Sequence, residues 1–136
     1  MTRRVQLDTN IVSHFLTGHP NVVRLLVATP MARVCISAIT EGELRFGVAK
    51  QPHARRIRAT VEGFLLRIDV LPWTRATAVI YGALRADMTR RGKALGPLDM
   101  LIAAHALEAN AILATNDAAF GRVAGLTVVD WTKGNP

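Results

Sequence analysis

Four acidic residues stand where side chains of this type could act together. Asp8 ends the apolar stretch "VQLD", and Asp117 closely follows another, "AILATND". Asp99 comes two residues after Pro97, which favours the first turn of a helix, and Glu43 lies within "ITEGEL". Each residue alone is also typical of a helix cap, a helix first turn or a solvated helix face. Together they are candidate oxygen ligands for a hard cation such as Mg²⁺ or Mn²⁺.

The elements that must position these acids are predicted to alternate between strands and helices. We expect strands at residues 3–8, 32–37, 68–73, 111–115 and 126–131, and helices at 11–16, 21–29, 38–50, 54–67, 75–92, 97–110 and, shorter, 117–123. This alternation is typical of a parallel sheet with helices on both faces. The predicted fold class is therefore a three-layer α/β/α arrangement around a mainly parallel sheet of about five strands.

In such a sheet Asp8 and Asp117 lie at the carboxyl edge, where open α/β folds keep their sites. Asp99 is expected in the first turn of its helix close to that edge, and Thr9 or Asn10 is expected to cap the helix that begins at residue 11. Glu41 competes with Glu43. Residues two apart on a helix differ by about 200° in direction, so only one of the two glutamates can face the site.

Composition predicts one domain over residues 1–136 with an aliphatic core. Half of the 136 residues are apolar and only 5% are aromatic. Charges, glycines and prolines interrupt every apolar run that could cross a membrane, and the start lacks the long apolar stretch of a signal peptide. The single cysteine, Cys35, cannot form an internal disulfide. We therefore expect a cytoplasmic protein with no membrane partner.

The net charge of +7 favours a polyanionic partner. Arginines gather as Arg3 and Arg4, as Arg55, Arg56 and Arg58, and as Arg90 and Arg91 with Lys93. Each cluster could be a solvated helix face. The planar guanidinium group also suits phosphate, so the clusters favour a nucleic acid as partner without establishing it.

Other kinds of site find less support. The four histidines, at positions 14, 19, 53 and 105, do not have zinc-ligand spacing, and no glycine-rich phosphate loop is present. Ser37 and Cys35 have no histidine and acid partners at recognisable spacing, which disfavours nucleophilic catalysis. A Mg²⁺-dependent phosphatase with Asp8 as nucleophile would usually have a second aspartate at the position of Asn10. A non-catalytic RNA-binding module would not need four acids that repel phosphate.

The order of these motifs resembles a known family. "VQLDTNIV", "ISAITEGELRFGV", "PLDMLIAAHALEANAILATNDAAF" and "LTVVDW" together are similar to a PIN domain, and more narrowly to the VapC-type ribonuclease toxins of bacterial toxin–antitoxin pairs. The resemblance covers essentially the whole chain. It implies the acidic site Asp8, Glu43, Asp99 and Asp117, with Thr9 and Asn116 in support. The family's glutamate precedes a leucine, as in "GEL", which favours Glu43 over Glu41.

The resemblance also implies an activity and partners. The expected activity is that of an endoribonuclease dependent on Mg²⁺, or Mn²⁺ in its place, which cleaves RNA with a metal-activated water and is the toxin of a type II toxin–antitoxin system. The expected partners are RNA, a cognate VapB-type antitoxin that blocks the site, and a second copy of the chain in a homodimer. A PIN-type nuclease of RNA processing or of DNA, and the Mg²⁺-dependent phosphatase, remain as alternatives.

Overall fold

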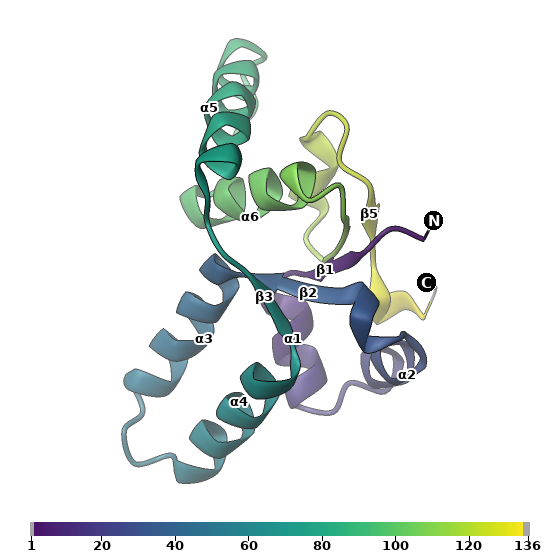
Figure 1. Ribbon diagram of the computed structural model, residues 1–136, viewed down its shortest axis with the longest axis vertical. Coiled ribbons are helices and arrows are strands. Elements are labelled where there is room, and N and C mark those ends of the chain that lie inside the picture. Colours follow the sequence, from purple (N-terminus) through teal and green to yellow (C-terminus); the bar gives the residue numbers. More distant parts are fainter. Residues whose placement is uncertain (1, 135–136) are drawn as a thin grey trace.

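A computed structural model describes residues 2–134 of the chain (Figure 1). Its sheet contains β1 (Val5–Leu7), β2 (Val34–Ser37), β3 (Asp69–Leu71), β4 (Ile112–Ala114) and β5 (Val128–Val129). The α-helices are α1 (Thr9–Leu16), α2 (Pro20–Ala28), α3 (Ala38–Ala49), α4 (Arg55–Arg67), α5 (Arg75–Arg90) and α6 (Pro97–Glu108). Single turns of 3₁₀ helix are η1 (Met31–Arg33), η2 (Ala118–Arg122) and η3 (Trp131–Lys133).

All neighbouring strands run parallel, in the order β3-β2-β1-β4-β5. Along the chain, β2 pairs beside β1 and β3 pairs beside β2. The chain then returns and places β4 on the other side of β1. The strand order therefore reverses between β1 and β4, and in open α/β sheets such a reversal leaves a crevice at the carboxyl ends of the two strands. Asp8 follows β1 and Asp117 follows β4, so these two acids flank the crevice.

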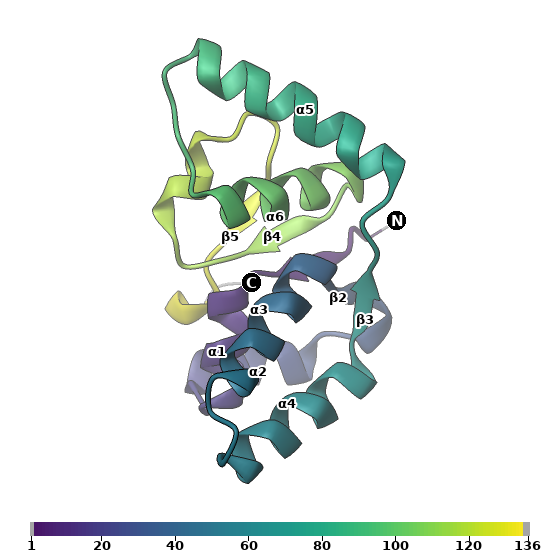
Figure 2. The same ribbon diagram turned by 90° about the vertical axis from the view of Figure 1, so that its left-hand side faces the viewer.

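The sheet lies between two layers of helices, as Figure 2 shows. On one side α5 and α6 enclose an apolar cluster that includes Met88, Ile102 and Phe120. On the other side α1, α2 and α4 enclose a second cluster that includes Leu7 and Ile11. The predicted three-layer α/β/α fold is confirmed. Within the described residues, no helix is both long and apolar enough to cross a membrane.

Several predicted boundaries need correction. Helix α1 begins at Thr9, and its cap is Asp8 rather than Thr9 or Asn10, because a carboxylate oxygen of Asp8 accepts the Thr9 backbone N–H at 2.7 Å. The strand expected over residues 126–131 pairs only at Val128–Val129, and the short helix expected over 117–123 is the 3₁₀ turn η2. The helix expected over 97–110 ends at Glu108 with Ala109 as its C-cap, and Asn110 follows with a left-handed φ of 51°.

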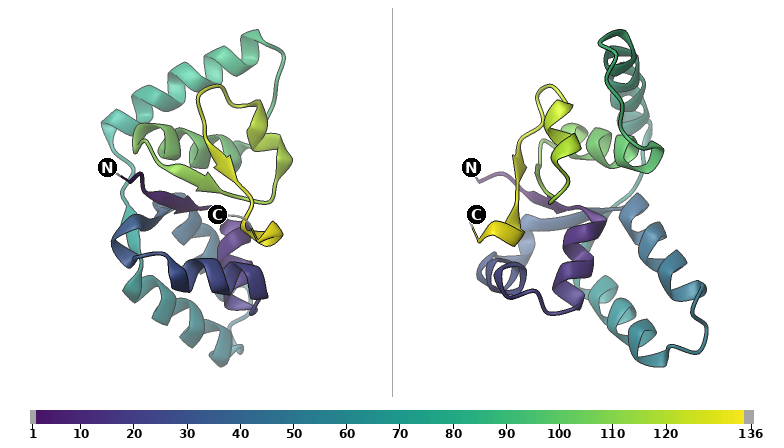
Figure 3. Two further views of the ribbon diagram at one scale, coloured as in Figure 1. Left: turned by 90° about the vertical axis from the view of Figure 1, so that its right-hand side faces the viewer. Right: turned by 180° about the vertical axis from the view of Figure 1, so that it is seen from behind.

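The end of the described chain packs against α2, as the two views of Figure 3 show. The side-chain amide of Asn21 donates to the carbonyl of Thr132 at 2.9 Å. Trp131, in η3, is buried against the cluster beneath the sheet. These contacts fix the chain after β5 on the face of the sheet opposite α5 and α6.

Candidate active site

Asp8 is the most deeply buried of the four candidate acids, with 3% of its surface exposed. The backbone N–H of Asp8 donates to the carbonyl of Ala114 at 2.9 Å, which fixes it between the ends of β1 and β4. Its two carboxylate oxygens accept separate hydrogen bonds, one from Thr9 N–H and one from the hydroxyl of Thr115 at 2.7 Å. Burial nevertheless raises the pKa of Asp8 to about 6, and the nearby charges of Asp99 and Glu43 add to this.

Thr115 is a residue of this site that the sequence analysis missed. It follows β4 directly and is buried. While its hydroxyl donates to Asp8, its oxygen accepts the backbone N–H of Asp117 at 3.1 Å. Thr115 therefore ties together the two acids that flank the crevice. The signal was its place in "ATND", immediately before the pair Asn116 and Asp117, at the end of a predicted strand.

Glu43 faces the same edge from α3. Its carboxylate accepts the Thr9 hydroxyl at 2.6 Å, and Thr9 Oγ1 also lies 3.1 Å from the hydroxyl of the buried Thr40. Glu41 turns the other way and pairs with Arg45 at 2.6 Å. The helix thus separates the two glutamates as the rotation argument requires, with Glu43 beside the residue that follows Asp8.

Asp99 lies in the first turn of α6, after Gly96 as N-cap and Pro97 at the first helical position. Asp117 lies between β4 and η2, close enough to Asp99 for their charges to interact. Its carboxylate accepts the N–H of Ala119 at 2.9 Å. Burial raises the pKa of Asp99, and the charges of Asp117 and Glu43 raise it further. All four predicted acids therefore lie at one edge of the sheet, close enough for their charges to interact.

Asn116, predicted to support the site, is exposed, and its amide nitrogen lies 3.3 Å from Nε2 of His14 in α1. Thr9, the other predicted supporting residue, contacts Glu43 directly. Thr9 is thus joined to the acids by a hydrogen bond, whereas Asn116 lies at the rim and contacts α1.

The donor set fits a hard divalent cation in its chemistry, since it consists of carboxylate and hydroxyl oxygens. Raised pKa values at Asp8 and Asp99 indicate negative charge that a cation would offset. Within residues 2–134, however, no three His, Cys, Asp or Glu side chains already form a metal-binding group. The hydrogen bonds from Thr9, Thr115 and the backbone fix the orientation of the Asp8 and Glu43 carboxylates.

Four other acids have structural partners. Asp69 pairs with Arg4 at 2.5 Å, Asp87 with Arg91 at 2.9 Å, and Glu62 with Arg45 at 2.8 Å. Asp130 caps η3, where its carboxylate accepts the backbone N–H of Thr132 at 2.9 Å. Each carboxylate is used in an ion pair or a cap.

Ser37 contacts a histidine that the spacing in the sequence did not reveal. Oγ of Ser37 lies 2.7 Å from Nδ1 of His105, a residue of α6 that is far away in the sequence. Both side chains are buried, and burial lowers the pKa of His105. The Ser37 hydroxyl oxygen also accepts Ile39 N–H as the cap of α3, and the His105 ring packs edge-on against Trp73. The pair joins β2, α3 and α6 in the interior, where no substrate reaches the hydroxyl.

Comparisons with known proteins decide the family. Residues 5–126 match the PIN domain family. The chain belongs to the PIN-domain family. A tRNA(fMet)-specific endonuclease VapC from Shigella flexneri is 38% identical over 130 residues, which are 95% of this chain and 98% of that relative. A Ribonuclease VapC2 from Haemophilus influenzae is 33% identical over 94% of this chain and 98% of its own.

Solved structures agree with the sequence relatives of this PIN domain. The toxin chain in the DNA-bound VapBC structure from Salmonella typhimurium has a TM-score of 0.88 at 34% identity, covering 96% of this chain and 99% of its own. VapBC2 from Rickettsia felis, bound to a promoter DNA fragment, gives 0.86 at 30% identity over 93% and 98% of the two chains. The predicted resemblance is confirmed, and this PIN domain is a ribonuclease of the VapC type.

The acid cluster predicts how stability of this PIN domain responds to charge removal. The pKa of Asp99 is raised in the folded state, so the folded state takes up protons more readily, and stability falls as pH rises through the interval between the unfolded and folded values. Above the folded pKa that penalty is present in full. We therefore expect Asp99→Asn to melt at a higher temperature than wild type in EDTA, while losing activity.

Mg²⁺ should reverse this order if it binds the folded site. Binding to the folded state alone stabilises it, so Mg²⁺ should raise the melting temperature of wild type more than that of Asp99→Asn. Melting curves of both proteins at neutral pH, in EDTA and in Mg²⁺, measure both effects. A variant less stable in EDTA, with both proteins insensitive to Mg²⁺, would make Asp99 a structural residue of the helix start.

Proposed function

We propose that the chain is a Mg²⁺-dependent endoribonuclease and the toxin of a type II toxin–antitoxin pair, with Asp8, Glu43, Asp99 and Asp117 as the catalytic metal ligands. The observation that carries the proposal is the gathering of these four acids at the β1–β4 crevice of a PIN domain. Mn²⁺ would substitute, because it accepts the same oxygen ligands.

The chain's own residues have distinct tasks in this proposal. Asp8 is held most rigidly, by β1, β4 and two hydrogen bonds, and it fixes the position of the cation. Thr9 and Thr115 orient the carboxylates of Glu43 and Asp8. When bound, Mg²⁺ lowers the pKa of a water and stabilises negative charge on the phosphate. In-line attack by water leaves a 5′-phosphate and a 3′-hydroxyl, so the 2′-hydroxyl takes no part.

A transfer RNA is the substrate to test first, because the 38%-identical relative is named a tRNA(fMet)-specific endonuclease. We expect the purified chain to cleave initiator tRNA in Mg²⁺ and to leave it intact in EDTA. Gel electrophoresis with end mapping reads the products. Cleavage in EDTA, or 2′,3′-cyclic phosphate ends, would contradict a metal-dependent hydrolysis.

The same assay separates the alternatives. Single-stranded DNA of the same sequence, supplied in parallel, tests the DNA nuclease. Release of phosphate from p-nitrophenyl phosphate tests the phosphatase. Cleavage of DNA in preference to RNA, or phosphatase activity without RNA cleavage, would replace the proposed function by the corresponding alternative.

A VapB-type antitoxin is the proposed protein partner, since structural relatives are VapBC complexes. A largely apolar groove of about 450 Å³ runs between α1, α3 and α4 and is lined by Leu16, Leu44, Val48, Ile57 and Val61. Thr9 and Glu43 form part of its lining, so a peptide that occupies the groove reaches the acid site. An antitoxin bound here would block that site.

A second copy of the chain is the other proposed partner. Large apolar side chains are exposed on α2, α4 and α5: Val27 is 76% exposed, Leu66 84% and Val79 70%. We propose that the second copy covers part of this exposed apolar surface. We expect the mass of a dimer by light scattering at tens of micromolar, and a monomer mass would contradict this part of the proposal.

A further inference from the structure

An acidic site cannot attract RNA by its own charge. Asp8, Glu43, Asp99 and Asp117 repel phosphate until a cation is bound, and even then the polyanionic strand extends beyond the cation. Affinity for nucleic acid comes chiefly from lysines and arginines that neutralise phosphates. The cations that hold the strand must therefore lie near the acids and must not be fully used in contacts within the protein.

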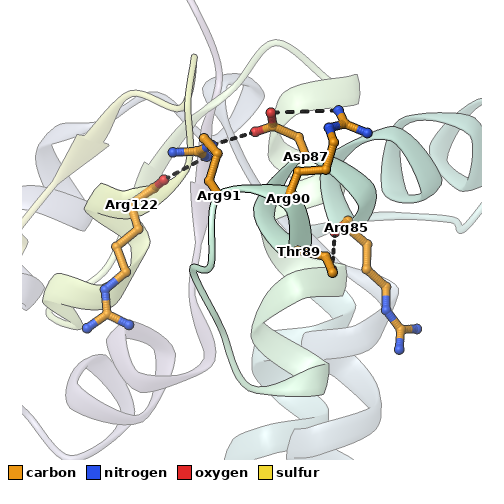
Figure 4. Close-up of polar contacts among 6 residues, drawn as sticks. All are labelled: Arg85, Asp87, Thr89, Arg90, Arg91 and Arg122. Atoms are coloured by element: carbon orange, nitrogen blue, oxygen red, sulfur yellow. Dashed lines mark hydrogen bonds and ion pairs between the residues drawn. The ribbon is translucent and has the colours of Figure 1, made fainter.

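The corner between α5 and α6 meets both conditions. We define it by Arg90 and Arg91 at the end of α5, Lys93 in the loop and Arg122 in η2, with Asp87 as the neighbouring acid. Figure 4 shows the three arginines with Asp87. Arg91 pairs with Asp87 at 2.9 Å, whereas Arg90 approaches it only to 3.9 Å and leaves 72% of its side chain exposed. Lys93 and Arg122 are exposed as well. Of these four cations, only Arg90 and Arg91 contact the Asp87 carboxylate.

Two hydrogen bonds hold this corner together, and short stretches of chain lead from it to Asp99 and Asp117. Arg91 donates to the carbonyl of Arg122 at 3.2 Å, and Arg122 donates in return to the carbonyl of Ala94 at 3.1 Å. The loop that contains Ala94 leads directly into the first turn of α6 with Asp99, and η2 begins directly after Asp117. In Figure 2 this loop descends on the side toward which β4 points, so the corner adjoins the carboxyl edge of the sheet.

The other arginine clusters fit less well. Arg3 and Arg33 lie near the amino ends of β1 and β2, away from the acids, and their guanidinium groups donate to backbone carbonyls. Arg4 there pairs with Asp69. Arg55 and Arg58 lie at the start of α4, at the opposite end of the molecule from the α5–α6 corner in Figure 1. Arg56 lines the groove of Thr9 and Glu43 that the antitoxin is proposed to occupy.

We propose that the α5–α6 corner binds the phosphate backbone of the RNA substrate beside the acid site, with Arg90, Lys93 and Arg122 as phosphate ligands and Arg91 as the residue that holds the loop in place. This inference rests on the proposed function, since it assigns the surface that positions the substrate of that site. Arg122 lies outside the arginine clusters visible in the sequence and joins the corner only through the fold.

The test compares two double variants that remove the same charge. Arg90→Gln/Lys93→Gln changes exposed residues of the corner, and Arg55→Gln/Arg58→Gln changes exposed residues of α4 that do not line the groove of Glu43. Neither pair removes a buried contact, and melting temperatures check that both fold. Fluorescence anisotropy with labelled initiator tRNA, in EDTA at several salt concentrations, measures binding without cleavage.

We expect the corner variant to bind the tRNA about tenfold more weakly at physiological salt and to lower the salt slope by about 0.7 to 0.9 for each lost phosphate contact. The α4 variant should bind nearly as wild type. Equal losses in both variants would show a general charge effect and overturn the proposal, as would a loss confined to the α4 variant. A loss of duplex DNA binding with tRNA binding unchanged would also overturn it. Binding is measured without Mg²⁺ and so does not depend on cleavage. A wild-type protein that binds tRNA in EDTA but does not cleave it in Mg²⁺ would contradict the proposed function without contradicting this inference.

Discussion

Replacing Asp8 with asparagine is expected to lower RNA cleavage to less than about a tenth of the wild-type rate, and by orders of magnitude if Asp8 is an essential ligand. Asparagine keeps an oxygen that accepts the Thr9 N–H, and its NH2 group can donate a hydrogen bond to the Thr115 hydroxyl oxygen. The substitution therefore removes charge at the β1–β4 crevice while it keeps the cap of α1. A cleavage assay with initiator tRNA in Mg²⁺ measures the effect.

Folding is the control for this variant. Because burial raises the pKa of Asp8 to about 6, its charge destabilises the folded state as pH rises from about 4 through 6. Asp8→Asn should then be at least as stable as wild type at neutral pH in EDTA. A stable variant that retains more than about a tenth of the activity would show that Asp8 is a helix cap and not a catalytic ligand.

Glu43→Gln is expected to abolish cleavage, whereas Glu41→Gln should retain most of it. The two residues lie on the same helix, and each substitution removes one negative charge, so they form a matched pair. Glu43 contacts Thr9 at the acid site, while Glu41 pairs with Arg45 on another side of α3. Exposed ion pairs contribute about 1 kcal/mol or less, so loss of the Glu41 pair should change stability little.

Steady-state cleavage rates of the two variants, measured beside their melting temperatures, decide this prediction. Loss of activity in Glu41→Gln with activity kept in Glu43→Gln would mean that the other face of α3 serves the site. Equal loss in both would point to damage to α3 itself, which the melting curves would reveal.

The gathering of the acids at one edge of the sheet could be predicted, because strand ends and helix starts leave local signals in the sequence. Asp8 and Asp117 follow short apolar runs, and Pro97 sets the start of α6 before Asp99. Parallel strands then bring their carboxyl ends together whatever their separation in the sequence. Helical rotation was likewise enough to predict that Glu41 and Glu43 point in different directions.

Contacts between distant segments could not be predicted. The hydrogen bond between Ser37 and His105, and the connection from Asp8 through Thr115 to Asp117, depend on how α6 and β4 pack beside β1 and β2. The cap of α1 was also misplaced, because Asp8, which directly follows β1, is itself that cap. A periodic pattern assigns a residue to one element and does not show that its side chain serves another.

Binding of Mn²⁺ tests the central claim most directly, because the claim is that the acids at the β1–β4 crevice hold a divalent cation. Titration followed by electron paramagnetic resonance counts bound Mn²⁺ without any substrate. We expect wild type and Glu41→Gln to bind Mn²⁺ alike, and Asp8→Asn and Asp99→Asn to bind it more than about tenfold more weakly, as loss of a charged ligand requires. Equal Mn²⁺ binding by all four proteins, or no binding by wild type, would contradict the account.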